Sequence, residues 1–502
     1  MQRRHRIPTF AGALWLCLAV GGAAAQGVAT PDVVAPASPA SAAASGDTSF
    51  LVQNLTRAEL WRFFEPRPGG GVHPDYVFFG NRSTLGARYR GARWGLHGAI
   101  QYVRLESLPS GAIGPGLLGT GGAYFYQANG TFSYQFYLRS LGLTFTHPRS
   151  GAWIEAGRFS RAEPASGDPT IDTLTRAHLN GRLLGDMEWS MYQRAWDGAR
   201  GGIARDGWRA TVTAAVPTQG TYEESANLSM SKLRVAAVEV NTRASALVPH
   251  TAVTAFAYAY DDRRGVTARP DNRVDLPAGT VPATARADVR IGTLGVSAVG
   301  AYPHAVGRWD ALLWGAVQTG HWYEQRHRAR AAAAHVGHQW TRVPWQPWLR
   351  AGVDYASGDA SAADNAHGTF FPMLPSGNQF SRSSSYAFMN VVDAWAEARV
   401  TPASAVDAQV AVHHVRLANR ADWWYTGSGA TARSGNYFGF QARNPAGEQA
   451  LGTVLEGEIT WRPARWYTLR VYAARMRGGE TVRAVFAGRR LVTAWLESLV
   501  SF

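Results

Sequence analysis

Between residue 49 and Phe502 the chain divides into about eighteen short stretches, many of which alternate apolar with polar residues. The clearest alternation covers residues 208–216, 349–355, 455–462 and 468–473. A period of two is typical of a β-strand whose two faces meet different surroundings. The pattern therefore predicts an all-β protein in which each strand has one apolar face and one polar face.

The connectors between these stretches alternate in length. The short ones lie at 91–92, 148–151, 249–250, 303–307, 343–344, 402–403 and 463–464, with a longer one at 198–207. The long ones are polar and rich in Gly and Pro, and they cover roughly 106–130, 164–185, 262–285, 357–386, 418–451 and 478–490. Two further connectors, near Pro68 and near Arg326, are shorter than the rest of this second class. Outer-membrane barrels have short periplasmic turns, long outer loops and an even strand number, so the alternation predicts a porin-like transmembrane antiparallel β-barrel of about 18 strands.

The two ends of the chain indicate export to the outer membrane of a Gram-negative cell. Residues 1–25 combine a basic start, an apolar run and a small-residue cleavage site, and so predict a signal peptide. Residues 26–48 are mostly Ala, Pro, Ser and Val and predict a disordered periplasmic tail, which leaves 49–502 as the barrel domain. Cys17, the only cysteine, lies in the signal peptide, so the mature barrel is expected without disulfides. The terminal Phe502 resembles the signal by which outer-membrane barrels are recognised for insertion.

Tryptophans mark the short connectors. Six of them lie within a residue or two of the end of such a connector: Trp94, Trp153, Trp208, Trp309, Trp345 and Trp466. Amphipathic rings settle at the level of the lipid headgroups, so these positions predict the periplasmic membrane interface. Two strands lose their alternation partway, and bulges are expected there at Gly142 and Gly295.

The formal charge is +14, which becomes +11 without the signal-peptide residues Arg3, Arg4 and Arg6, and Lys232 is the only lysine. An arginine excess suits nucleic acid, anionic lipid headgroups or an anionic substrate, because the guanidinium group pairs with phosphate and carboxylate. The export signal argues against nucleic acid. The expected partners are therefore outer-membrane lipid and an anionic polysaccharide or small anionic solutes, with periplasmic export machinery as a further candidate.

Several blocks of the sequence resemble the alginate export family of outer-membrane barrels. They are RAELW at 57–61, GRF at 157–159, PWLRAG at 347–352, SGD at 357–359, HGTFF at 367–371, RLANRAD at 416–422 and GGETVRA at 478–484. The best-known members carry the anionic polyuronate alginate out of the cell through an eighteen-stranded channel. The resemblance implies passive export of an alginate-like polysaccharide from the periplasm to the exterior.

A channel for a polyuronate needs positive charge dispersed along its lumen, so that binding is weak and repeated. Arginines with the parity of the polar strand faces are the candidates: Arg82, Arg88, Arg139, Arg194, Arg209, Arg350, Arg399 and Arg470, with Arg158 of undetermined facing. Acidic residues share this parity at Asp354, Asp393, Glu397, Glu456 and Glu458. Each arginine therefore has two interpretations, a guide for carboxylates or a structural partner of an acid on a neighbouring strand.

Other functions have less support in the sequence. It contains no nucleophile elbow, phosphate loop or Cys/His cluster, so no enzyme, cofactor or metal site is expected. The connector at 357–386 has two interpretations, a cation site using Asp359 and Asp364 or an inward-folded plug. A general anion-preferring porin for small solutes is the alternative function, and a surface adhesin presented on the long loops is a third.

Overall fold

The computed structural model describes residues 46–68, 74–114, 123–125, 128, 130–161, 165–220, 227–266, 268–273, 289–376, 380–433 and 438–502. The predicted signal peptide at 1–25 lies outside the described residues, as does the predicted tail up to residue 45. The first strand begins at Asp47, two residues before the expected start of the barrel.

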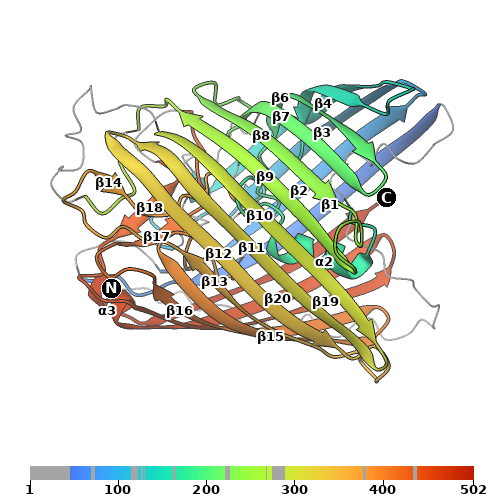
Figure 1. Cartoon of the computed structure of the whole chain (residues 1–502). Coiled ribbons are helices and arrows are strands. Elements are labelled where there is room, and N and C mark those ends of the chain that lie inside the picture. The colour runs from blue at the N-terminus through green and yellow to red at the C-terminus, as the bar shows by residue number, and fades with distance from the viewer. Residues whose placement is uncertain are drawn as a thin grey trace.

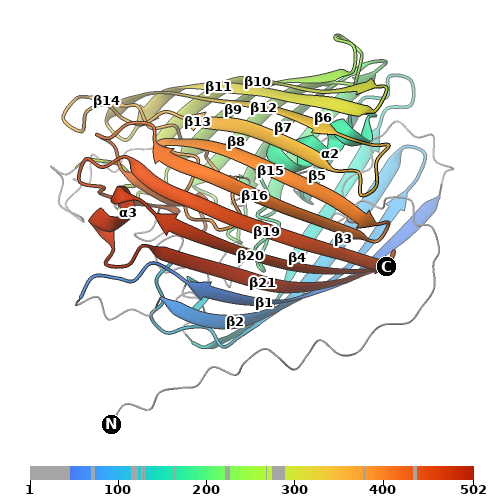
Figure 2. The ribbon, with the colours of Figure 1, turned by 90° about the horizontal axis from the view of Figure 1, so that it is seen from below.

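Within the described residues, eighteen antiparallel strands form one closed barrel, as the alternating pattern predicts (Figures 1 and 2). They are β1 (Asp47–Arg62), β2 (Asp75–Arg90), β3 (Trp94–Glu106), β4 (Phe132–Thr146), β5 (Trp153–Phe159), β6 (Trp196–Arg205), β7 (Trp208–Pro217), β8 (Leu233–Thr242), β9 (Thr251–Asp262), β10 (Val289–His304), β11 (Gly307–Trp322), β12 (Gln325–Gln339), β13 (Trp348–Ala356), β15 (Val391–Ala403), β16 (Val406–Leu417), β19 (Ala450–Ala464), β20 (Tyr467–Gly478) and β21 (Arg490–Ser501). Each strand pairs with the next along the chain, and β21 closes the ring on β1 from Gln53↔Ser501 to Arg62↔Val492. Closure leaves no strand edge exposed to lipid.

The predicted alternation of connectors is present. Short turns lie at the end of the barrel that holds the C-terminus, and most elements of the long loops gather at the other end, whereas the helix of the loop between β5 and β6 lies toward the C-terminal end (Figure 1). The connector near Arg326 is a two-residue turn at 323–324.

One predicted connector is wrong. Residues 198–205 belong to β6, its turn to β7 holds only Asp206 and Gly207, and the preceding loop extends to residue 195. The glycines of β6 explain the error. A Cβ at Gly198 or Gly202 would strike the backbone carbonyl of Ala214 or Ala210 on β7, so these glycines permit close strand approach and do not form a turn.

Side-chain exposure confirms which face of each strand meets lipid. On β13, Leu349 is 49% exposed and Val353 45%, whereas Arg350 between them is 4% exposed. Five of the six turn tryptophans also lie exposed on the outer surface. Trp153 is the exception, because it faces inward and is 7% exposed beneath the guanidinium of Arg209.

One of the two expected bulges is displaced and the other is absent. In β4 the register shifts at Arg139, since Ala99 pairs with Ser140 and Ile100 with Leu138. No shift occurs in β10, where the bulge at Gly295 was expected. The extra residue in β4 turns both Arg139 and Ser140 inward, and the outward parity resumes at Leu141.

Several long loops carry structure of their own. The β5–β6 loop holds α2 (Pro169–His178), the β13–β15 loop holds β14 (Ala366–His367), the β16–β19 loop holds the β17 (Trp424–Gly427) and β18 (Phe440–Arg443) ribbon, and the β20–β21 loop holds α3 (Glu480–Val485). Within the described residues, neither helix is long and apolar enough to cross a membrane.

The β13–β15 loop folds into the barrel, which favours the plug interpretation of this segment. Phe370, Phe371, Met373 and Leu374 are fully buried, and the Phe371 carbonyl accepts a hydrogen bond of 2.7 Å from the inward-facing Gln318 of β11. Among the described residues, no group of three or more His, Cys, Asp or Glu side chains is placed to hold a metal ion.

Candidate functional site

A cavity of about 540 Å³ lies inside the barrel, between α2 and the inward faces of the strands. Figure 2 shows α2 behind the wall formed by β15 and β16. Nine arginines line the cavity: Arg57, Arg82, Arg139, Arg161, Arg176, Arg350, Arg382, Arg399 and Arg470. Six carboxylates line it as well: Asp172, Asp186, Glu188, Glu397, Glu456 and Glu497. The lining therefore carries an excess of positive charge within reach of water.

Helix α2 is held in the lumen at both of its ends. At its start Arg308 of β11 donates a hydrogen bond to the hydroxyl of Thr170, while the Asp168 side chain caps the helix by accepting from the backbone N–H groups of Thr170 (2.8 Å) and Ile171 (3.1 Å). At its end His178 stacks on Trp395 of β15, with 5.4 Å between the ring centroids, and contacts the guanidinium of Arg350. Burial and the charge of Arg350 lower the pKa of His178 well below its usual value, so its neutral ring accepts a hydrogen bond from this arginine.

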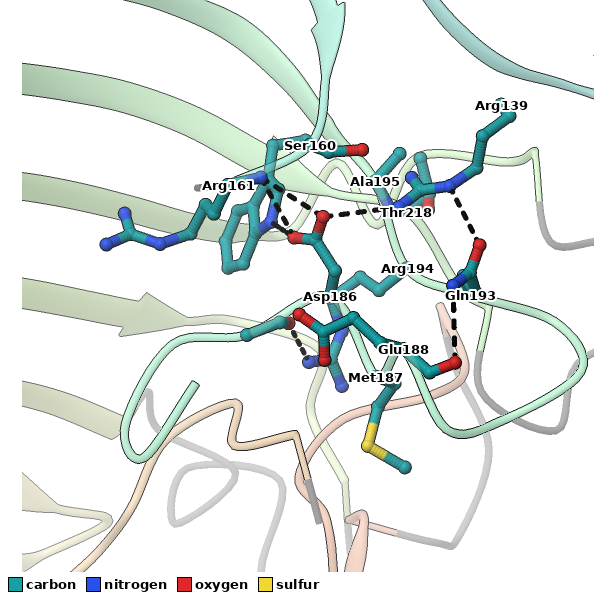
Figure 3. A network of polar contacts seen from close by, with 12 residues as sticks. Arg139, Ser160, Arg161, Asp186, Met187, Glu188, Gln193, Arg194, Ala195 and Thr218 are labelled. Carbon is teal, nitrogen blue, oxygen red and sulfur yellow. Dashed lines mark hydrogen bonds and ion pairs between the residues drawn. The ribbon is translucent and has the colours of Figure 1, made fainter. Parts of the chain in front are cut away.

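Asp186 joins the rest of the β5–β6 loop to the barrel wall (Figure 3). Its carboxylate accepts hydrogen bonds from Arg139 (3.2 Å), from the backbone N–H of Arg161 (3.1 Å) and from the indole of Trp196 (2.7 Å). Arg82 supports the same loop by donating to the backbone carbonyl of Ser190 at 2.7 Å. Arg82 and Arg139 of the inward strand faces thus position the loop, and their guanidinium groups donate hydrogen bonds to acceptors within the protein.

A chain of charges crosses the junction where the barrel closes. Glu497 of β21 accepts two hydrogen bonds from Arg57 of β1, at 3.0 and 2.7 Å, and one from Arg470 of β20 at 3.0 Å. Arg57 also pairs with Glu59 at 3.2 Å. Two arginines and two carboxylates therefore meet at the junction, and among them Arg470 keeps part of its guanidinium accessible to water, since its side chain is 24% exposed.

Other arginines of the cavity differ in how far their charge is compensated. Arg350 pairs with Asp310 at 3.0 Å and is buried. Arg399 is 3.5 Å from Asp407 and 31% exposed, and Arg382 pairs with Glu458 while 35% of its side chain stays exposed. Arg176 is exposed on α2 and has no carboxylate partner among the described residues. The water-accessible positive charge of the cavity therefore resides on Arg176, Arg382, Arg399 and Arg470.

The structure brings only some of the predicted site residues together. Those that line the cavity are Arg82, Arg139, Arg350, Arg399, Arg470, Glu397 and Glu456. Arg88 and Arg209 have the lumenal parity but lie outside this lining. Asp354 and Glu458 also lie outside it and pair with loop arginines, Asp354 with Arg182 at 2.9 Å and Glu458 with Arg382. The arginine partners of these two carboxylates thus come from loops, while Asp354 also accepts hydrogen bonds from His335 and Trp395 on the neighbouring strands.

Two predicted positions need correction. Arg158 lies opposite the outward Leu141 and shares its parity, so it is on the outer face of β5, where it pairs with Asp197 at 2.6 Å. Arg194 is not on a strand but near the end of the β5–β6 loop. It is fully buried and donates to backbone carbonyls of three loops, those of Gly185, Leu374, Ser428 and Ala430.

Sequence reasoning missed residues that come from loops or from the closing strands. They are Arg57, Arg161, Arg176, Arg382, Asp186, Glu188 and Glu497. A signal existed for Arg57 and Glu497, since a closed barrel places the last strand beside the first and both residues have inward parity there. For Arg382 and Asp186 no period indicates facing, because they lie in irregular loops.

Comparisons with known proteins agree with this architecture. A family model described as alginate export matches residues 174–488. No curated protein matches the chain.

Solved outer-membrane channels share the fold at low sequence identity. OccK2 (OpdF) of Pseudomonas aeruginosa in complex with glucuronate has a TM-score of 0.54 at 8% identity, covering 91% of this chain and 98% of that one. OccAB4 of Acinetobacter baumannii has a TM-score of 0.55 at 8% identity, with coverages of 91% and 98%. OpdK of Pseudomonas aeruginosa with vanillate has a TM-score of 0.55 at 8% identity, with coverages of 90% and 98%. At this identity the likeness shows the fold alone, a closed antiparallel β-barrel.

Proposed function

The chain belongs to the alginate export family, whose members are transport channels of the outer membrane and not enzymes, and we propose that it exports an anionic, alginate-like polysaccharide by passive diffusion. The observation that carries this proposal is the cavity beside α2, where arginines outnumber carboxylates and several guanidinium groups stay accessible to water. A polymer with one carboxylate per sugar meets successive positive charges as it passes.

The partial compensation of these arginines suits transport better than tight binding. Arg399 and Arg470 each share a carboxylate with a second arginine, Arg462 on Asp407 and Arg57 on Glu497. A passing sugar carboxylate finds a guanidinium that already has one partner, so it gains an ion pair without being held firmly. Conduction requires such weak and repeated sites.

A second candidate, a channel for small anionic solutes, is favoured by the size of the cavity. Its volume of about 540 Å³ is that of a typical small-molecule site, and α2 together with the inward loops narrows the lumen. OccK2, which has the same fold, was solved with glucuronate, the monomeric relative of a polyuronate.

Current through the purified barrel in a planar bilayer distinguishes the two candidates. Oligomeric polymannuronate, glucuronate at equal carboxylate concentration and uncharged dextran of equal length are added in turn to the periplasmic side. The export proposal expects the uronate oligomer to interrupt an anion-selective current, while dextran leaves it unchanged. If glucuronate reduces the current and the oligomer does not, the small-solute function replaces export.

A further inference from the structure

Arginines on the outer surface of the barrel wall gather at the end that carries the long loops. On β12, Arg326, Arg328 and Arg330 are exposed and share the parity of Val336, which is 53% exposed on the lipid-facing side. We call these three residues the β12 stripe. They occupy the part of the strand next to the outer turn at 323–324, and the same face continues as Ala332 and Ala334 toward the periplasm.

A second set lies near the closing junction. Arg475 and Arg477 of β20 share the parity of Val471, which is 47% exposed, and Arg490 of β21 lies directly opposite Arg477. We call Arg475, Arg477 and Arg490 the β20–β21 cluster. Like charges directly opposite each other destabilise an antiparallel strand pair, so this arrangement requires an anion to offset the repulsion.

That anion does not come from the described part of the chain. For some other arginines of the outer surface the protein supplies a partner, since Arg104 pairs with Glu106 and Arg290 lies 3.3 Å from Asp261. Arg62 and Arg416 resemble the two sets in having no such partner among the described residues, but each is a single exposed arginine on its strand face. Across the described residues, the guanidinium groups of the β12 stripe and of the β20–β21 cluster have neither a hydrogen bond nor an ion pair. Six arginines therefore face the membrane without protein acceptors.

The depth of both sets follows from the strand ends. An outward arginine is costly at the middle of the bilayer and tolerated near its interfaces. All six side chains lie in the outer halves of their strands, whereas the opposite rim carries tryptophans such as Trp309 and Trp466, 52% and 46% exposed. The two rims thus face chemically different surroundings, and the arginines lie at the level of the outer headgroups.

We propose that the β12 stripe and the β20–β21 cluster bind the phosphates on the glycolipid anchor of lipopolysaccharide in the outer leaflet. A guanidinium group pairs bidentately with phosphate, and arginines two residues apart on one strand face are spaced by about 7 Å, so neighbouring side chains converge on one phosphate. A phosphate between Arg477 and Arg490 removes their repulsion. The apolar rows below, Ala332 and Ala334 on β12 and Ala473 on β20, offer a surface for the acyl chains.

The test compares two triple variants with a control of equal charge. One variant replaces the β12 stripe by glutamine and the other replaces the β20–β21 cluster by glutamine. The control replaces the exposed Arg93, Arg149 and Arg342 of the periplasmic turns by glutamine. Binding of lipid A to each full-length barrel in detergent is measured by native mass spectrometry, and folding is checked from the heat-dependent shift in gel mobility. Dephosphorylated lipid A, phosphatidylglycerol and inorganic phosphate are the comparison ligands.

One arginine near an anionic membrane surface contributes about fivefold to binding affinity. Each triple variant is therefore expected to bind lipid A on the order of 100-fold more weakly, while the control binds as wild type does. Dephosphorylated lipid A and inorganic phosphate should bind weakly to every protein. Equal binding by wild type and both variants overturns the proposal, and so does equal loss in the control. If phosphatidylglycerol binds as tightly as lipid A, the clusters recognise anionic lipid in general and not the glycolipid. If both triple variants fail to fold, the single variants Arg477→Gln and Arg328→Gln are compared with wild type instead, and each should reduce the binding of lipid A by a smaller factor.

Discussion

Replacing Arg182 by methionine should weaken the docking of α2 in the lumen, because this side chain connects the end of the helix to the wall through a buried ion pair. Its Nη1 lies 2.9 Å from Asp354 of β13, its Nε donates to the His178 carbonyl at the end of α2 at 2.9 Å, and its guanidinium packs on the rings of Trp314 and Phe380 at 4.9 and 4.8 Å. Both charged side chains are almost fully buried, with exposures of 2% and 4%. Methionine retains much of the apolar contact and removes the charge.

The expected loss follows from the partners that remain. Breaking a buried ion pair by removing one member costs about 3–5 kcal/mol, because the other charge stays buried. Asp354 keeps hydrogen bonds from His335 at 3.1 Å and from the Trp395 indole at 2.9 Å, so the lower limit applies. About 3 kcal/mol raises the population of the undocked helix on the order of 100-fold.

Thiol labelling measures this population. Leu174 lies on the buried face of α2 and is 1% exposed, so a Leu174→Cys side chain is expected to react with a maleimide only when the helix undocks. Combined with Arg182→Met, its labelling rate should rise on the order of 100-fold, and single-channel recordings should show longer visits to a higher conductance. Arg62→Met, on the outer surface, is the matched control. A labelling rate unchanged by Arg182→Met would show that other contacts hold the helix and would refute the reasoning.

Three further predictions concern charge, pH and backbone. Arg470→Gln should lower the anion preference of the current and Glu397→Gln should raise it, each by about fourfold in permeability ratio, since one charge about 5 Å from the ion in water is worth about 0.8 kcal/mol. Shifts of the reversal potential in the same direction for both variants would contradict a lumenal location of these side chains. Burial raises the pKa of Asp422 to about 7, so the folded β16–β19 loop binds this proton more tightly than the unfolded loop does. The resistance of the loop to proteolysis should therefore fall as the pH rises from 4 to 7. Asp422→Asn should abolish that pH dependence. Gly439→Ala should make the same loop more sensitive to protease at every pH, because Gly439 has a φ of +121° and a Cβ there would strike the Gly429 carbonyl. Gly447→Ala is the control, and it should increase protease sensitivity less, because a Cβ has open space there although φ is +81°.

The sequence predicts the barrel wall well because facing along a strand is a local property. Leu349 and Arg350 differ in environment only through the period of two, and the period is visible without any knowledge of neighbours. The prediction of strands fails around Gly198 and Gly202. Glycines are typical of turns, but these two lie within a strand and let β6 and β7 approach closely. Arg158 shows a similar limit, since a five-residue stretch around Gly157 does not fix which face it occupies.

The candidate site is less predictable because loops complete it. Arg194 donates to carbonyls 180 and more residues away, and Asp186 joins β4 to the β5–β6 loop, contacts that no local pattern encodes. Glu497 is an intermediate case. Its pairing with Arg57 spans 440 residues, yet it follows from closure of the ring, which places β21 against β1 in a definite register.

The same strand shows why the net positive charge of the chain has no single explanation. Arg470 and Arg475 both belong to β20 and lie five residues apart, so their side chains point to opposite faces. Arg470 meets Glu497 across the lumenal surface, whereas Arg475 has Leu455 and Val492 as its cross-strand neighbours on the outer surface. The lumenal arginine is partly neutralised by the protein and stays available to a moving anion, and the outer one must find its counter-charge in the membrane. Substitutions at the two positions should therefore have different effects. Arg470→Gln should change ion selectivity and not glycolipid binding, and Arg475→Gln should change glycolipid binding and not ion selectivity.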